Sequence, residues 1–214
     1  MMWYTHAVFG ALFALLIQLV GTKLGVLSFN ELYVGIAAFG ALLPDVDHPK
    51  SYISMKLPFS NVVSSIILEH TKHRGVTHTI EAGVIISIIT GIIISYFFGL
   101  SLGMSVIFLF VGYTSHLFAD SLTVSGVRWS KFSNFKLSWK IKTGTLSEGL
   151  ILVPTVFSTV VLYFYLSNPK VKTDIMGLFL AALLLTYVLV GRKAGKLFRN
   201  QTIVAKKTKR RRKH

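Results

Sequence analysis

The chain alternates between long apolar runs and short polar connections. Five runs reach or approach the roughly 20 residues that a helix needs to cross a hydrocarbon core about 30 Å thick. They cover residues 7–27, 79–99, 102–122, 149–166 and 175–190. A sixth run, residues 32–43, is shorter, so it crosses with little tilt, lies at an edge or is re-entrant. The pattern predicts an all-α fold, a multi-pass transmembrane bundle of about six helices.

One polar connection, residues 123–148, contains a segment with a different period. From residue 135 to residue 142, apolar and polar side chains alternate strictly, which is typical of a half-buried strand. Ser133 and Asn134 could turn this strand back against residues 127–132. We therefore predict a small cytoplasmic β-hairpin or interfacial loop, with aromatic rings at the membrane interface and lysines directed toward lipid headgroups.

The composition agrees with a membrane protein. Hydrophobic residues make up 52% of the chain and charged residues only 14%, whereas soluble domains carry about 25% charged residues. The chain has no cysteine, which excludes disulfides and thiolate metal sites and leaves His, Asp and Glu as candidate ligands. The N-terminus lacks a basic leader, so residues 7–27 are expected to be a retained span.

The net charge of +15 is unevenly distributed. If all six runs cross, 20 of the 23 Lys and Arg residues lie on one side: four in loop 45–78, five in loop 123–148 and eleven after residue 190. The positive-inside rule then places both loops and both termini in the cytoplasm. We divide the chain into a membrane domain, residues 1–198, and a basic tail, residues 199–214, which we expect to be disordered and to contact polyanions non-specifically.

Most of the rare ionisable side chains fall at the predicted cytoplasmic ends of the apolar runs. They are His6, Asp45, Asp47, His48, His73, His78, Glu81, His116, Asp120 and Glu148. Buried charges in a bilayer are costly unless they are paired or bind an ion. Their shared depth favours one polar site over scattered packing interactions.

Three of these groups suggest chemistry, and each also has an ordinary structural interpretation. His116 and Asp120 are spaced i, i+4, so one ion can reach both, although such a pair can also hydrogen-bond between helices. Residues 45–48 (Asp-Val-Asp-His) suit a divalent ion, or form a helix C-cap and turn between two prolines. Residues 73–78 supply two histidines and Arg74, which could stabilise an anion or touch anionic lipid. His6 and Glu148, taken singly, are typical of an interfacial histidine and a helix N-terminal carboxylate.

The order of these motifs resembles the YdjM-like family of membrane-bound metal-dependent hydrolases. The resemblance covers residues 6 to about 150 and rests on Pro44-Asp45-x-Asp47-His48-Pro49, His73-Arg74-Gly75-x-Thr77-His78 and His116-x3-Asp120-x2-Thr123-x2-Gly126. It implies a distant similarity to zinc-dependent phospholipase C and P1-type nucleases, which are all-α and bind a cluster of metal ions. Those enzymes also use a later His-x3-Glu pair, and Gly144 stands at the histidine position here. The resemblance therefore implies a mono- or dinuclear site.

We therefore predict a membrane-bound metal-dependent hydrolase that cleaves a phosphoester or phospholipid at the cytoplasmic membrane face. The expected cofactor is a divalent metal ion, Zn, that activates water. The candidate catalytic residues are Asp45, as base or bridging carboxylate, and Arg74. The candidate metal ligands are His6, Asp47, His48, His73, His78, His116, Asp120 and Glu148. The alternative is a non-catalytic protein that binds metal or membrane lipids, or a scaffold that recruits partners through its basic tail.

Overall fold

The named elements of the structure are all helical. The computed structural model describes residues 1–47, 51, 54–55, 76–133, 135–168, 177–178 and 181. Its elements are α1 (Trp3–Lys23), α2 (Glu31–Gly40), the 3₁₀ turns η1 (Leu43–Asp47) and η2 (Val76–His78), α5 (Ile80–Phe98), α6 (Leu102–Ser121) and α7 (Leu146–Ser167). Four of them, α1, α5, α6 and α7, are long and apolar enough to cross a membrane. The predicted all-α transmembrane fold is confirmed, while the run at 175–190 and the tail fall almost wholly outside the described residues.

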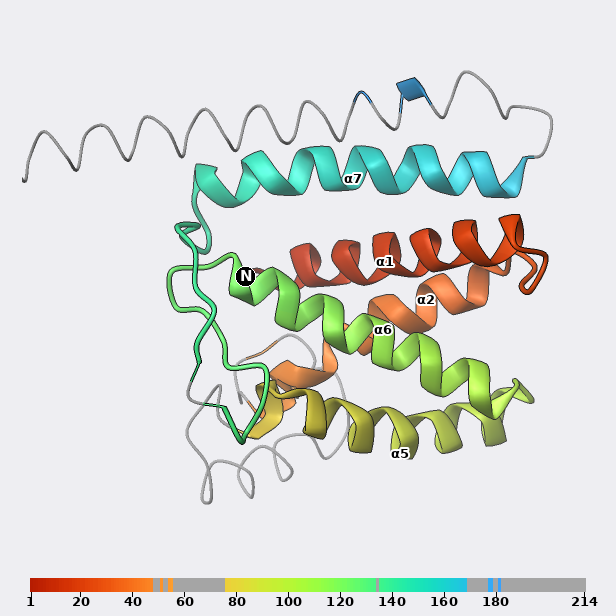
Figure 1. Cartoon of the computed structure of the whole chain (residues 1–214), viewed down its shortest axis with the longest axis horizontal. Helices are drawn as coiled ribbons and strands as arrows, with labels where there is room; N and C mark the ends of the chain where they lie inside the picture. Colours follow the sequence, from red (N-terminus) through yellow and green to blue (C-terminus); the bar gives the residue numbers. More distant parts are fainter. Residues whose placement is uncertain are drawn as a thin grey trace, which may run out of the picture.

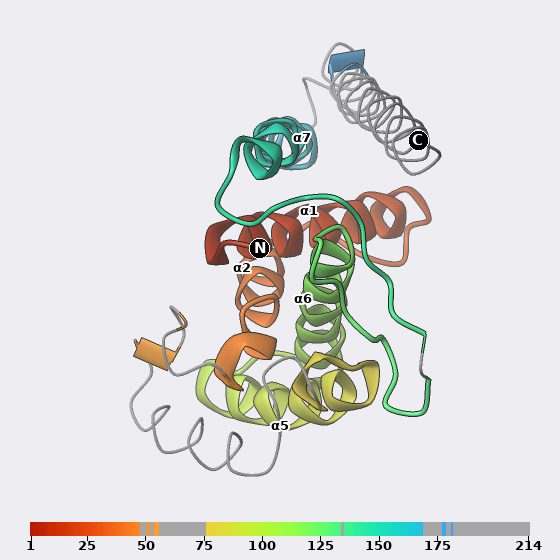
Figure 2. The same ribbon diagram turned by 90° about the vertical axis from the view of Figure 1, so that its left-hand side faces the viewer.

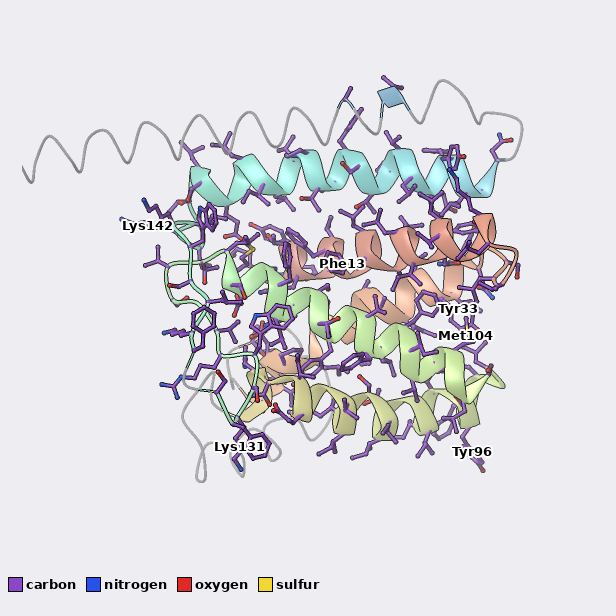
Figure 3. The ribbon with its side chains drawn as sticks, in the orientation of Figure 1. Phe13, Tyr33, Tyr96, Met104, Lys131 and Lys142 are labelled. Carbon is purple, nitrogen blue, oxygen red and sulfur yellow. The ribbon has the colours of Figure 1, made fainter. Side chains whose placement is uncertain are left out.

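The helices form a bundle with α2 and α6 near its centre. Helix α2 packs against α1 and α6, α5 covers α6, and α7 lies along α1 (Figures 1 and 2). The outer helices expose many large apolar side chains, among them Ile85, Ile89 and Tyr96 of α5 and Val153 and Phe164 of α7. Figure 3 shows these outer faces covered by side chains. An apolar exterior of this kind fits lipid rather than water.

The short apolar run returns the chain to the end of the bundle at which α1 begins. Helix α2 has ten residues and spans only about 15 Å, and η1 follows it and adds about 10 Å. The backbones of α1 and α2 lie in close contact, because a Cβ added to Gly10 would lie 2.5 Å from the Ala37 carbonyl oxygen. A Cβ on Gly112 would overlap the same oxygen from α6. Small residues thus let α2 fit between its two neighbours.

The alternating segment at 135–142 forms isolated bridges rather than continuous strands. Val127 pairs with Leu137, each amide donating to the other's carbonyl at 2.9 and 3.0 Å, and Thr123 bridges Ile141. Between these contacts the chain is drawn to the first turn of α5, where the Ile80 amide donates to the Trp129 carbonyl at 2.8 Å. This contact keeps residues 128–132 from pairing further. Of the two predicted alternatives, the interfacial loop is therefore the closer description.

Candidate metal centre

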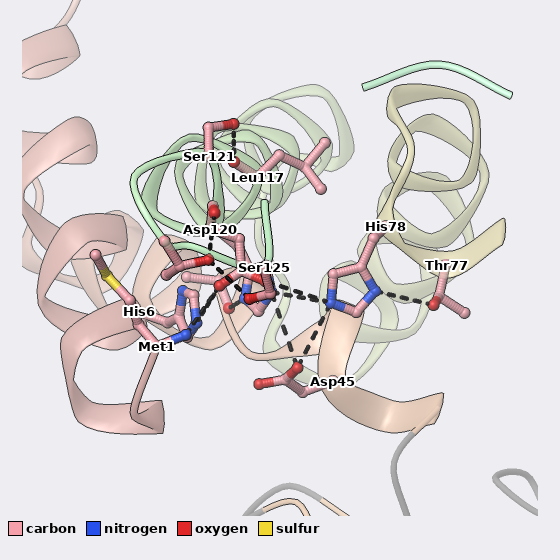
Figure 4. A network of polar contacts seen from close by, with 12 residues as sticks. Met1, His6, Asp45, Thr77, His78, Leu117, Asp120, Ser121 and Ser125 are labelled. Carbon is pink, nitrogen blue, oxygen red and sulfur yellow. Dashed lines mark hydrogen bonds and ion pairs between the residues drawn. The ribbon is translucent and has the colours of Figure 1, made fainter. Parts of the chain in front are cut away.

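Five ionisable side chains from four elements meet at one end of the bundle (Figure 4). They are His6 near the start of α1, Asp45 in η1, His78 in η2, and His116 and Asp120 in the last turns of α6. Two groups have ligand atoms within 4.8 Å of one another: His6, His116 and Asp120, and Asp45, His78 and His116. The side chain of Asp45 is 23% exposed, whereas the other four are at most 1% exposed. The site is therefore buried, and Asp45 lies on its solvent side.

His116 has a defined role for each of its ring nitrogens. Its Nδ1 lies 2.7 Å from the Ala41 carbonyl oxygen, which only accepts hydrogen bonds, so Nδ1 must carry the proton and donate it. In the neutral ring, Nε2 of His116 then carries a free lone pair. This atom lies 3.3 Å from Nε2 of His78. Nδ1 of His78 lies 3.2 Å from the Thr77 hydroxyl. Both rings are thus oriented from their Nδ1 sides, as is usual for metal-binding histidines.

The spacing of the donor atoms fits one tetrahedral ion. Ligands bound at about 2.0–2.2 Å in a tetrahedron lie about 3.3–3.6 Å apart. His78 Nε2 is 3.3 Å from His116 Nε2, 3.6 Å from Asp45 Oδ1 and 3.9 Å from Asp120 Oδ2. His116 Nε2 is 3.9 Å from Asp45 Oδ1 and 3.8 Å from Asp120 Oδ2. These five distances lie close to the tetrahedral range, so the residues present fit a metal.

Asp120 connects this set to His6. Its other oxygen, Oδ1, accepts a hydrogen bond from the Met1 ammonium at 2.9 Å and lies 3.5 Å from Nε2 of His6. The His6 ring stacks on that of His116, with centroids 3.7 Å apart and planes 14° from parallel. Nδ1 of His6 is buried and has no hydrogen-bond partner among the described residues. His6 therefore packs against the four donors as a fifth potential ligand.

The electrostatics favour a cation at this place. Burial raises the pKa of the Asp45 carboxyl, but His116, when it is protonated, and the nearby ring of His78 outweigh this effect and hold that pKa well below its usual range. With the imidazoles counted as uncharged, two carboxylates and one ammonium group leave a net charge of −1. A buried negative charge is unfavourable unless it is compensated. A divalent cation would compensate it.

Not every predicted ligand belongs to this cluster. Glu148 lies outside both groups: its carboxylate accepts hydrogen bonds from the Met2 amide, the Thr5 hydroxyl and the Gly144 amide, each at 2.7 Å, and so ties the start of α1 to that of α7. Asp47 ends η1, but its side chain is not among those that the structure describes, so its role as a ligand stays a prediction. His48, His73 and Arg74 lie outside the described residues, and their roles stay predictions.

Sequence reasoning missed three neighbours of the ligands. The Ala41 carbonyl, the Thr77 hydroxyl and the Met1 ammonium all contact ligand side chains. Thr77 has a signal in the sequence, since it directly precedes His78 in a polar motif. The other two are the main-chain carbonyl of Ala41 and the N-terminal amine of Met1, and residue type reveals neither contact.

Comparison with known proteins indicates that the chain is a membrane protein. The family described as YdjM inner membrane protein matches residues 1–195. A protein of Bacillus subtilis (strain 168), named uncharacterized protein YvsG, is 34% identical over 132 residues, which cover 60% of this chain and 76% of that protein. No solved structure matches the chain.

Proposed function

We propose a function for this chain from the premise that it belongs to the YdjM inner membrane protein family. The chain is a membrane-bound metal-dependent hydrolase that cleaves a phosphoester at the membrane surface. One observation carries this proposal: imidazole and carboxylate donors from three elements, η1, η2 and α6, lie at the mutual distances of metal ligands. The orientation that follows from the basic loops puts the site on the cytoplasmic side.

Four side chains are assigned to hold the ion: His78, His116, Asp45 and Asp120. Mixed imidazole and carboxylate donors in a tetrahedral arrangement favour Zn²⁺. When bound, the ion supplies a Lewis acid and lowers the pKa of coordinated water toward 7. His6 contacts both Asp120 and His116, so it orients these two ligands or joins them as a fifth.

Asp45 is the group nearest solvent, and its depressed pKa bears on its role. An effective general base has a pKa near the working pH, whereas a carboxylate that stays ionised is a good ligand. The direction of the Asp45 shift therefore favours coordination over proton transfer. Of the two roles that the sequence allowed, we assign Asp45 as a metal-binding carboxylate.

The position of the cluster suggests the kind of substrate. The donors lie at the ends of helices long enough to cross a membrane, which places them near the level of the lipid headgroups. A phospholipid or another amphiphilic phosphoester reaches this level without leaving the bilayer. We therefore assign this substrate class.

The test measures metal content and turnover on one set of proteins. The purified chain is treated with chelator, reloaded with Zn²⁺ and assayed for release of water-soluble phosphate from phospholipid in micelles. Asp45→Asn should lose metal and turnover together, while the control His214→Ala, at the last residue, should keep both. Retained metal with lost turnover would instead make Asp45 the base. A metal-loaded wild type that hydrolyses none of the phosphoesters offered would contradict the proposal.

A second function is favoured by the same geometry. Four protein donors fill a tetrahedral site, and closed sites of this type are usually structural, whereas catalytic sites keep a position open. In this case the metal holds η1, η2 and α6 together, and the protein binds lipids or recruits partners through its basic tail. Zn²⁺ would then raise the unfolding temperature without producing turnover, and removal of residues 200–214 would disrupt partner binding.

A further inference from the structure

The segment 128–142, which connects α6 to α7, carries positive charge alone. It contains Arg128, Lys131, Lys136, Lys140 and Lys142 and no acidic residue. Among the described residues, no ion pair joins Arg128, Lys131, Lys136 or Lys142 to a carboxylate. Described carboxylates therefore do not neutralise the positive charges of these four side chains.

The same segment exposes large aromatic side chains. Phe132 is 89% exposed, Phe135 70% and Trp139 53%. Exposed aromatic rings interleaved with lysines are typical of the membrane–water interface, where the rings enter the boundary layer and the ammonium groups reach the phosphates. A surface that bound a soluble polyanion through charge alone would not need the exposed phenylalanines.

Hydrogen bonds hold the segment in place. The Trp139 amide donates to the Thr123 carbonyl at 2.9 Å. The Glu81 carboxylate of α5 accepts hydrogen bonds from the Ser130 hydroxyl at 2.5 Å and the Lys131 amide at 3.3 Å. Glu81 therefore fixes the backbone of the loop through neutral donors. The side chains of Lys131, Lys136 and Lys142 are exposed, whereas the ammonium group of Lys140 is buried.

The loop lies at the end of the bundle that contains the metal centre. Its residues follow Asp120 closely along the chain, and Figure 1 shows it joining the ends of α6 and α7. Lys131 and Lys142 lie at this end, both directed away from the helices (Figure 3). The basic and aromatic side chains thus occupy the level at which the spanning helices end.

We propose that segment 128–142 binds the headgroups of anionic phospholipids in the leaflet on the side of the metal centre. The aromatic rings enter the boundary between headgroups and acyl chains, and the lysines contact lipid phosphates. Acidic lipids are thereby concentrated beside the donor cluster. This binding goes beyond the proposed hydrolysis and does not require it, since a non-catalytic protein would bind the same lipids.

The test compares lipids retained by the purified full-length protein. The protein in mild detergent is mixed with equal amounts of phosphatidylglycerol and phosphatidylcholine, and the lipids that co-elute on gel filtration are quantified by mass spectrometry. The variant combines Lys131→Gln, Lys136→Gln and Lys142→Gln. The matched control combines Lys206→Gln, Lys207→Gln and Lys209→Gln, which removes the same number of charges from the tail.

We expect the wild type to retain more phosphatidylglycerol than phosphatidylcholine. In the loop variant the ratio of the two retained lipids should be at least about threefold smaller. The tail control should keep most of it, and arginine at the same three loop positions should preserve it. The preference should shrink as salt rises. Equal retention of both lipids by the wild type would overturn the proposal, as would a preference that is lost in the tail control and kept in the loop variant. Loop-dependent co-purification of nucleic acid without lipid preference would assign the surface to another polyanion and also overturn it.

Discussion

The two oxygens of the Asp120 carboxylate have different surroundings. Oδ1 faces the Met1 ammonium and His6, while Oδ2 faces His78 and His116. The i, i+4 spacing with His116 is local to one helix, so the sequence alone predicted that these two side chains share a face. The stacking of His6 on His116 depends on how α1 packs against α6. No local pattern in the sequence encodes that contact.

The orientation of His78 offers a test at a residue that is not itself a ligand. Thr77→Val keeps the shape of the side chain but removes the hydroxyl that lies 3.2 Å from His78 Nδ1. We expect metal affinity to fall about 10–100-fold, because loss of a group that orients a ligand has effects of this size. The measurement is a competition titration against a chromogenic chelator.

Thr114→Val is the matched control for this substitution. Among the residues that the structure describes, the Thr114 hydroxyl donates only to carbonyls of its own helix, those of Phe110 and Val111. This variant should bind metal as the wild type does. Equal affinity in all three proteins would show that the Thr77 hydroxyl does not orient a metal ligand.

At the scale of elements, the position of α2 between α1 and α6 determines where Asp45 lies. The contact at Gly112 leaves no room for a side chain, because a Cβ there would overlap the Ala37 carbonyl oxygen. Gly112→Ala should destabilise the protein by about 1–3 kcal/mol through overpacking and should also weaken metal binding. Thermal unfolding in detergent, with and without metal, measures both effects.

Gly103→Ala provides the comparison on the same helix. Nothing lies within 4 Å of a Cβ added at Gly103, so this variant should unfold close to the wild-type temperature. If Gly112→Ala is as stable as Gly103→Ala, the close packing of α2 against α6 is not needed to build the site.

The elements also show why the sequence predicted some features and missed others. The long apolar runs predicted α1, α5, α6 and α7, because hydrophobic length alone decides whether a helix can span. The period of residues 135–142 predicted strands, but contacts with α5 at Trp129 limit the pairing to isolated bridges. Glu148 was a plausible ligand by position, and tertiary packing instead directs it to the Met2 amide and the Thr5 hydroxyl. Hydrophobic length was thus a reliable signal, whereas the pairing of residues 135–142 and the partners of Glu148 depend on tertiary contacts.

At the scale of the whole molecule, the candidate metal centre and the loop 128–142 lie at one end of the bundle and the turn at 24–30 at the other (Figure 1). The basic loops predict that the end with the metal centre faces the cytoplasm. Because the chain has no cysteine, single-cysteine variants report one site each. Ser28→Cys should react with an impermeant thiol reagent in intact cells, and Thr143→Cys should react only after lysis. The reverse pattern would place the metal centre on the outer face.

The central claim is that the five convergent side chains form a metal site, and elemental analysis of the purified protein tests it most directly. The account predicts close to one divalent ion per chain in the wild type, with Zn²⁺ the expected metal. It also predicts that His116→Ala and Asp120→Ala lose the ion and that added metal no longer raises their unfolding temperature. His214→Ala should match the wild type. If His116→Ala and Asp120→Ala keep a full complement of metal, or if a metal-loaded wild type cannot be obtained, the cluster is a hydrogen-bonded packing contact and not a metal centre.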